Sequence, residues 1–221
     1  MSDYYRNVNL DLLNKIPTNS NCILEIGCGS GWMGEAFKAK NPSAKYFGIE
    51  LFETAAEEAA TRLDGVICAN IELDLTLPSK LAPLFDVVVF GDVLEHLQDP
   101  WRVLSELRKY IQPGGLCVTC IPNVAHWSLI SGLLRGKWDY ADAGLLDRTH
   151  LRFFTLDTAV EMFQKTGWTV FDASPRNFWP ELTEQAMQVL LPVATAFGMP
   201  EANARLNMST FQWVMSARNG A

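Results

Sequence analysis

The stretch Ile23-Leu24-Glu25-Ile26-Gly27-Cys28-Gly29-Ser30-Gly31 decides the fold of this chain. Its first four residues are typical of a short buried strand, and three glycines at alternate positions then allow a tight turn. Helical periodicity follows over residues 33–40. Such a turn brings backbone N–H groups and a helix N-terminus close to a ligand. The stretch therefore predicts a strand, a glycine-rich ligand-binding turn and a helix.

Outward from this stretch, short apolar runs alternate with segments of helical periodicity. Strands are predicted at residues 22–26, 45–49, 66–68, 85–90, 116–121, 168–173 and 210–217. Helices are predicted at residues 33–40, 53–63, 100–110, 156–166 and 181–197, the last with a kink at Pro192. This alternation is typical of a parallel sheet covered by helices.

Composition narrows the class of protein. The 221 residues are 48% hydrophobic and carry a formal net charge of −7, and no linker-like segment divides them, which predicts a single domain over residues 1–221. The acidic balance disfavours nucleic acid as a partner, and no apolar run reaches the roughly 18 residues of a membrane span. The first residues lack a signal-peptide pattern, and the five cysteines lie mostly in apolar segments. We therefore expect a cytoplasmic protein with reduced cysteines and no membrane insertion.

The glycines fit two nucleotide-binding patterns. Gly27, Gly29 and Gly31 form GxGxG directly after the strand, whereas Gly29, Gly31 and Gly34 form the dinucleotide fingerprint GxGxxG. The fingerprint glycines should follow the strand at once, and only the first register does so. The second register leaves a nicotinamide-dependent oxidoreductase as an alternative function.

With Glu25 two residues before Gly27, the first register resembles the opening motif of the class I S-adenosylmethionine-dependent methyltransferases. Further motifs resemble that family in the same order, namely residues 46–50, 69–72, 85–97 and 113–115. The motif at residues 85–97 closely resembles that of the subgroup that includes ubiquinone-pathway O-methyltransferases. The resemblance implies a Rossmann-like, doubly wound α/β fold with a seven-stranded sheet, mostly parallel with the last strand antiparallel.

The resemblance also implies that S-adenosylmethionine lies over the glycine turn. The Glu50 carboxylate would accept hydrogen bonds from the ribose diol, and Asn70, where the family more often has Asp, would contact the adenine. The cofactor-binding residues that we expect are Tyr5, Arg6, Glu25, Gly27, Cys28, Gly29, Gly31, Glu50, Leu51, Asn70, Ile71, Gly91 and Asp92.

Methyl transfer to an alcohol needs a group that takes the proton of the acceptor. Asp92 and His96 follow the strand at residues 85–90, where open α/β sheets place their ligands, and they share a face if the segment is helical. His150 is the third catalytic candidate, as a metal-free base or as a helper hydrogen-bonded to Asp147. The competing interpretation is that His96 only caps or packs the next helix.

Glu95, His96 and His150 are also candidate metal ligands. Small-RNA 2′-O-methyltransferases and some ubiquinone-pathway enzymes bind a divalent ion with an acid-x-x-Glu-His motif and a later His. This chain is similar, with Asp92 where those enzymes often carry Glu. Imidazoles and carboxylates could hold such an ion against the acceptor hydroxyl and lower its pKa.

Residues 122–154 and 177–207 are expected to form the acceptor-binding insertions. The first segment holds Trp127, Trp138, Tyr140, Phe153 and Phe154 together with Arg135, Lys137, Arg148 and Arg152. These side chains suit stacking on a sugar or ring and binding an anion, or they form a small core under a lid.

Residues 147–155 resemble bacterial methyltransferases associated with glycan biosynthesis. That likeness implies O-methylation of a saccharide or small hydroxylated metabolite. A non-catalytic methyltransferase-like module stays an alternative. The helical spacing of Met187, Leu190, Leu191 and Ala194 fits either core or a homodimer face.

Overall fold

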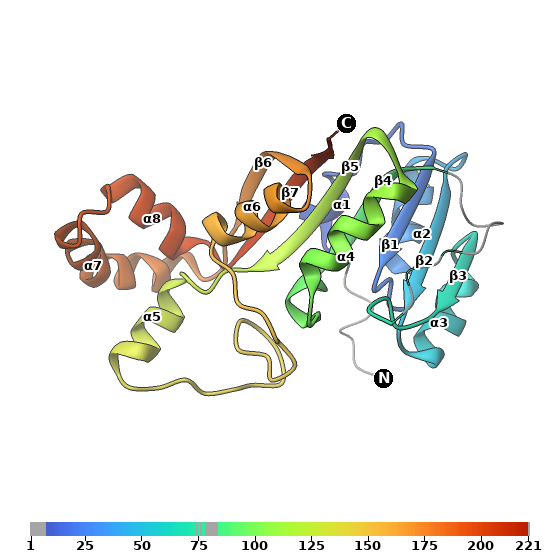
Figure 1. Cartoon of the computed structure of the whole chain (residues 1–221). Helices are drawn as coiled ribbons and strands as arrows, with labels where there is room; N and C mark the ends of the chain where they lie inside the picture. Colours follow the sequence, from blue (N-terminus) through green and yellow to red (C-terminus); the bar gives the residue numbers. More distant parts are fainter. Residues whose placement is uncertain (1–7, 74, 76, 78–83, 221) are drawn as a thin grey trace.

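The computed structural model describes residues 8–73, 75, 77 and 84–220. In this part of the chain seven strands form one sheet in the order β3-β2-β1-β4-β5-β7-β6, with helices on both faces (Figure 1). All neighbouring strands are parallel except that β7 runs antiparallel to β5 and β6. The predicted α/β fold, a mostly parallel sheet with an antiparallel last strand, is therefore confirmed.

The strands are β1 (Cys22–Ile26), β2 (Lys45–Glu50), β3 (Gly65–Cys68), β4 (Phe85–Gly91), β5 (Ile111–Pro122), β6 (Trp168–Arg176) and β7 (Gln212–Asn219). The α-helices are α1 (Leu10–Leu13), α2 (Trp32–Lys40), α3 (Glu53–Ala60), α4 (Pro100–Leu107), α5 (Trp127–Leu134), α6 (Leu156–Lys165), α7 (Pro180–Ala196) and α8 (Glu201–Ser209). The helices α1, α5 and α8 were not predicted, and α1 is a single turn of four residues.

Alternating side chains of the strands build two cores, one on each face of the sheet. Leu24 belongs to the core that packs under α4 and α6, and Ile23 belongs to the core under α1 and α2. Cys117 and Cys120 likewise belong to opposite cores, as the strand period predicts, and both are free thiols.

Helices α5, α7 and α8 lie together beyond the sheet, at the left of Figure 1. They share a small third core of Met187, Leu190, Leu191, Ala204 and Met208. The helical spacing noted in α7 is thus used for packing within the chain. None of the helices in the described ranges is long and apolar enough to cross a membrane.

Two features of the core under α1 and α2 lead to predictions about stability. Gly34 lies inside α2, and a Cβ there would be 2.3 Å from Leu63 Cδ2 and 2.6 Å from Tyr46 Cδ1. Glu25 of β1 is only 4% exposed, and its Oε2 has no hydrogen-bond partner among the described residues. Burial raises the pKa of the Glu25 carboxyl to about 8.

We expect Gly34→Ala to lower the free energy of unfolding by about 1 kcal/mol or more, because overpacking costs roughly 1–3 kcal/mol and outweighs the gain in helix propensity of about 1 kcal/mol. Gly132→Ala in α5 is the matched control, since its nearest contact would be 3.4 Å from Lys137 O. It should be neutral or stabilising in urea unfolding. Equal effects at the two positions would contradict the packing argument.

We expect Glu25→Gln to stabilise the chain more as the pH rises from 5 to 8. Between an unfolded pKa near 4.5 and a folded pKa of about 8, the folded chain holds an extra proton at Glu25. Its stability therefore falls with rising pH by up to about 1.4 kcal/mol per unit, and the variant escapes this loss. Urea unfolding at pH 5, 6.5 and 8 measures the difference, with Glu161→Gln on the exposed face of α6 as control. A pH-independent difference would refute the assignment.

Candidate functional site

The glycine-rich turn lies at the carboxyl end of β1, where the strand order reverses between β1 and β4. Gly27, Gly29 and Gly31 have φ angles of +68°, +52° and +82°, which glycine adopts without steric cost. Gly27 N–H donates to Ile49 O of β2 over 2.8 Å. A Cβ at Gly27 would lie 2.6 Å from Val93 Cγ2. The turn after β1 therefore packs directly against the turn after β4, at the crevice where such sheets bind ligands.

Glu50 ends β2, and its carboxylate faces the glycine turn. The residue is 5% exposed. Its Oε2 accepts from Gly29 N–H over 2.8 Å, and its Oε1 accepts from Phe52 N–H over 3.0 Å. A carboxylate offers about four lone-pair sites, so each oxygen retains capacity for one more donor. Glu50 can thus bind a vicinal diol while it stays tied to the turn.

The other expected cofactor residues surround this crevice. Leu51 is exposed directly after β2, and Asn70 and Ile71 follow β3, the first exposed and the second buried. Asn70 Oδ1 accepts from Glu72 N–H over 2.9 Å, which shapes the turn there.

Three more of the expected cofactor residues lie beneath the crevice or at its edge. Cys28 is buried against Gly48, where a Cβ would meet the Cys28 sulfur at 2.3 Å. Glu25 is buried in β1, and Gly91 ends β4 against Leu12. Tyr5 and Arg6 lie outside the described residues.

Asp92 follows β4 with a φ of +54°, an uncommon conformation for a residue other than glycine. Its N–H donates to Cys120 O over 3.3 Å, and its Oδ1 accepts from Gln212 Nε2. Burial raises the pKa of the Asp92 carboxyl to about 6, and the positive charge of Arg176 opposes this rise.

The condition under which Asp92 and His96 would share a helical face is not met. The left-handed backbone at Asp92 ends the regular structure, and only a single 3₁₀ turn, η3 (Leu94–His96), follows. Asp92 and His96 nevertheless line the same cavity, because the short turn folds both side chains toward the carboxyl edge of the sheet.

His96 and His150 lie side by side, with ring centroids 4.7 Å apart at an interplanar angle of 72°. His96 Nδ1 is 3.2 Å from Thr149 O, and His150 Nδ1 is 3.3 Å from Leu145 O. A carbonyl oxygen can only accept, so each Nδ1 carries a proton and each neutral ring keeps its lone pair on Nε2. Burial and the neighbouring His96 lower the pKa of the His150 imidazole.

Asp147 is not the side-chain partner of His150 that the sequence suggested. His150 N–H donates to the backbone oxygen of Asp147 over 3.0 Å. The Asp147 carboxylate instead accepts from Thr149, with Oδ1 at 2.8 Å from its N and 2.6 Å from its Oγ1. The hydroxyl of Thr149, 3.1 Å from His96 Nδ1, thereby links Asp147 to His96.

Glu95 is 1% exposed, and neither of its carboxyl oxygens has a hydrogen-bond partner among the described residues. Burial and the charge of Asp92 raise the pKa of Glu95 well above its usual range. One ligand atom each from Glu95, His96 and His150 lie within 4.8 Å of one another, so the three expected metal ligands do come together. An unpaired buried carboxylate is costly, and this group therefore calls for a proton or a cation.

These side chains line a cavity of about 200 Å³ whose far wall the sequence did not reveal. Arg176, Phe211 and Gln212 belong to that wall. Arg176 is the last residue of β6, and Gln212 is the first residue of β7. Because these two strands are antiparallel, both residues lie at the same edge of the sheet. No local motif marks them. Only their place at the ends of the last two strands could have indicated a role.

The aromatic residues of segment 122–154 divide into core and surface. Phe154 is 3% exposed in the main core, and Trp127 Nε1 donates to Thr183 Oγ1 over 3.0 Å beside the third core. Trp138, Tyr140 and Phe153 remain exposed, and the rings of Trp138 and Phe153 lie 5.6 Å apart.

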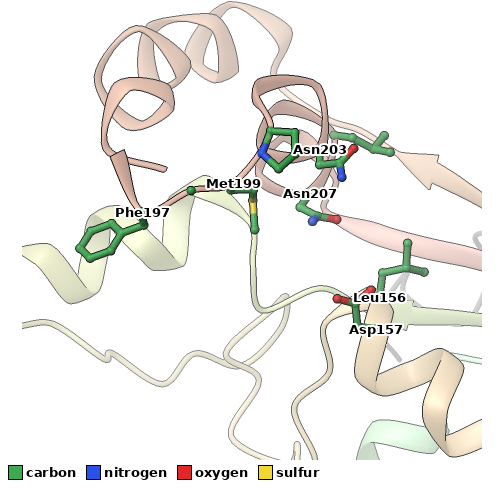
Figure 2. A pocket seen from close by; sticks show the side chains of 9 residues that line it. Leu156, Asp157, Phe197, Met199, Asn203 and Asn207 are labelled. Atoms are coloured by element: carbon green, nitrogen blue, oxygen red, sulfur yellow. The ribbon is translucent and has the colours of Figure 1, made fainter. Parts of the chain in front are cut away.

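A second cavity, of about 510 Å³, lies between the turn that joins α7 to α8 and the start of α6 (Figure 2). Phe197, Met199, Asn203 and Asn207 line one side, and Leu156 and Asp157 line the other. The expected catalytic residues lie in the smaller cavity, which we therefore take as the reaction site.

Comparison with known proteins extends these observations. Residues 1–173 match a family model described as a methyltransferase domain. The ubiquinone biosynthesis O-methyltransferase of Idiomarina loihiensis is 32% identical over 116 residues, which cover 48% of this chain and 45% of that protein. The chain spans between a third and a half of the length of the first curated relatives that it matches.

Two solved structures share the fold at lower identity. A SAM dependent methyltransferase from Archaeoglobus fulgidus matches with a TM-score of 0.64 and 18% identity, over 98% of this chain and 96% of that one. The plantazolicin methyltransferase BpumL, solved in complex with SAH, matches with a TM-score of 0.60 and 18% identity, over 96% of this chain and 80% of that one. Since the family match contains the glycine turn, Glu50 and the turn after β4, the chain belongs to the methyltransferase-domain family.

Proposed function

We propose that the chain binds S-adenosylmethionine over the glycine turn and transfers its methyl group to a hydroxyl oxygen of a saccharide or small hydroxylated metabolite. The observation that carries this proposal is the packing of the Gly27 turn against the turn after β4, which leads into the cavity of Asp92 and His96. The sulfonium of the bound cofactor supplies an activated methyl group, so the protein must orient the acceptor and manage its proton.

The residues at the turn fit this cofactor. The two oxygens of Glu50 suit the ribose diol, and the glycines leave backbone unobstructed at the start of α2. Leu51, Asn70 and Ile71 lie where a base next to that ribose would sit, after β2 and β3. The neighbours crystallised or named with this cofactor or its product support the same assignment.

The cavity offers two ways to remove the proton of the acceptor hydroxyl. The lone pairs on Nε2 of His150 and His96 can accept it directly. Alternatively, Glu95, His96 and His150 would hold a divalent cation, which would lower the pKa of the acceptor hydroxyl so that water can take its proton. The orphaned oxygens of Glu95 and the two Nδ1–carbonyl contacts favour the cation, because metal-binding histidines usually donate their other N–H to such a partner.

Oxygen as the acceptor atom is supported by the relative named as an O-methyltransferase. A saccharide or ring is supported by the exposed Phe153 and Trp138. The ring centroid of Phe153 lies 6.4 Å from that of His150, and the ring centroid of Trp138 lies 5.6 Å from that of Phe153. The net charge of −7 supports a small acceptor over nucleic acid.

We expect Glu50→Ala to weaken binding of S-adenosylhomocysteine at least tenfold, because it removes the acceptors of the ribose diol at about 1.5–3 kcal/mol per charged hydrogen bond. Isothermal titration calorimetry measures this, with Glu53→Ala at the first residue of α3 as control. Titration with NAD tests the alternative register. Tight NAD binding without S-adenosylhomocysteine binding would overturn the proposal.

We expect His150→Ala to lower methyl transfer at least a hundredfold while S-adenosylhomocysteine affinity stays within twofold, since His150 serves the acceptor and not the cofactor. The assay uses labelled S-adenosylmethionine with sugar, phenol and RNA acceptors. Loss of activity in EDTA, restored by Mg²⁺ or Zn²⁺, would assign the cation, whereas activity unaffected by EDTA would assign the free base. Unchanged turnover in His150→Ala would contradict both roles of His150, as a free base and as a ligand of the cation.

A further inference from the structure

Gln212 and Arg176 belong to no motif, yet both are hydrogen-bonded in series with Asp92. Gln212 Nε2 donates to Asp92 Oδ1, and Gln212 Oε1 accepts from Arg176 Nη1 over 2.6 Å. Arg176 Nε in turn donates to Asp11 Oδ2 of α1 over 3.0 Å. The series runs from α1 through β6 and β7 to the turn after β4.

The chemistry of the three groups fixes the orientation of the middle one. A guanidinium can only donate, so the amide oxygen of Gln212 must face Arg176. The amide NH₂ group must then face the Asp92 carboxylate, which can only accept when ionised. Gln212 is 8% exposed, and its backbone is held between Pro122 of β5 and Arg176 of β6. Glutamate at this position would face Asp92 with a second negative charge, and leucine would leave Arg176 and Asp92 without their shared partner.

Asp92 has an unfavourable backbone conformation and a buried carboxylate, and hydrogen bonds to its side chain offset these costs. Its φ of +54° lies in a region that costs a residue other than glycine about 1 kcal/mol or more. Its carboxylate lies in a buried cavity beside Glu95, whose own ionisation it opposes. The direction of the Asp92 carboxylate therefore sets the electrostatics of the cavity that holds Glu95, His96 and His150.

We propose that Gln212 and Arg176 are positioning residues, which aim the Asp92 carboxylate into the acceptor cavity and act on methyl transfer only through it. The inference rests on the proposed function, because it concerns the same cavity. It assigns a role in turnover to two residues beyond the family match, since Arg176 and Gln212 both lie after residue 173.

The first test is Gln212→Leu, measured with the acceptor that gives transfer in the panel of sugars, phenols and RNA. We expect kcat to fall at least tenfold while S-adenosylhomocysteine affinity stays within twofold. Gln112→Leu is a matched control, because Gln112 Nε2 donates to Asp86 Oδ1 over 2.8 Å at the opposite end of β4. It should lose comparable stability in urea unfolding and keep kcat within twofold.

The second test exchanges carboxylate and amide in the double variant Asp92→Asn with Gln212→Glu. The exchange keeps a hydrogen bond between positions 92 and 212 and pairs Arg176 with a carboxylate, so stability should return close to that of the wild type. The charge, however, has moved away from position 92, and we expect kcat to stay as low as in Asp92→Asn alone. Recovery of kcat to the wild-type level would show a merely structural role and overturn the inference.

A double-mutant cycle checks that Gln212 acts through Asp92. In the Asp92→Asn background, Gln212→Leu should lower kcat by less than a further twofold, and full additivity would contradict the inference. If the wild type binds S-adenosylhomocysteine and transfers methyl groups while Gln212→Leu keeps its kcat, the positioning role fails and the proposed function stands. If the wild type binds no S-adenosylhomocysteine, the proposed function fails and the positioning role fails with it.

Discussion

The contact between the turn after β1 and the turn after β4 is the constraint on which the rest of the site depends. Only a glycine at position 27 allows it, because a Cβ there would lie 2.6 Å from Val93 Cγ2. The close approach brings the ligand-binding turn, tied to Glu50 through Gly29, next to the residue pair Asp92 and His96. In a parallel sheet the two turns meet only where the strand order reverses, and this chain reverses it between β1 and β4.

The second constraint is electrostatic. Asp92 and Glu95 are both buried in one cavity, and two carboxyl groups so placed do not both ionise without compensation. Arg176 and Gln212 stabilise the charge on Asp92, whereas both oxygens of Glu95 lack hydrogen-bond partners among the described residues. Of this pair, Asp92 is therefore the anion held by hydrogen bonds, and Glu95 is the carboxyl that takes a proton or a cation. Buried charges of this kind lower the free energy of unfolding, and they are typical of sites where fixed charges orient or stabilise a reacting group.

Much of the fold could be predicted from sequence because its signals are local. The glycine turn follows a buried strand at once, and the period of each strand sorts side chains such as Cys117 and Cys120 onto opposite faces. The same locality explains the errors. Nothing near Asp92 in the sequence indicates its positive φ, so the sequence could not decide between a helix and the 3₁₀ turn that follows. Gln212 reaches Asp92 only because β7 is inserted between β5 and β6, a partnership across 120 residues that no local pattern encodes.

Hydrogen–deuterium exchange with and without S-adenosylhomocysteine tests most directly whether one ligand bridges the turns after β1 and β4. We predict such a bridge, with slower exchange at amides of residues 27–31 and 50–52, and at amides of residues 92–96 on the adjoining turn. Protection absent from both turns, or confined to the cavity between α7 and α6, would contradict it.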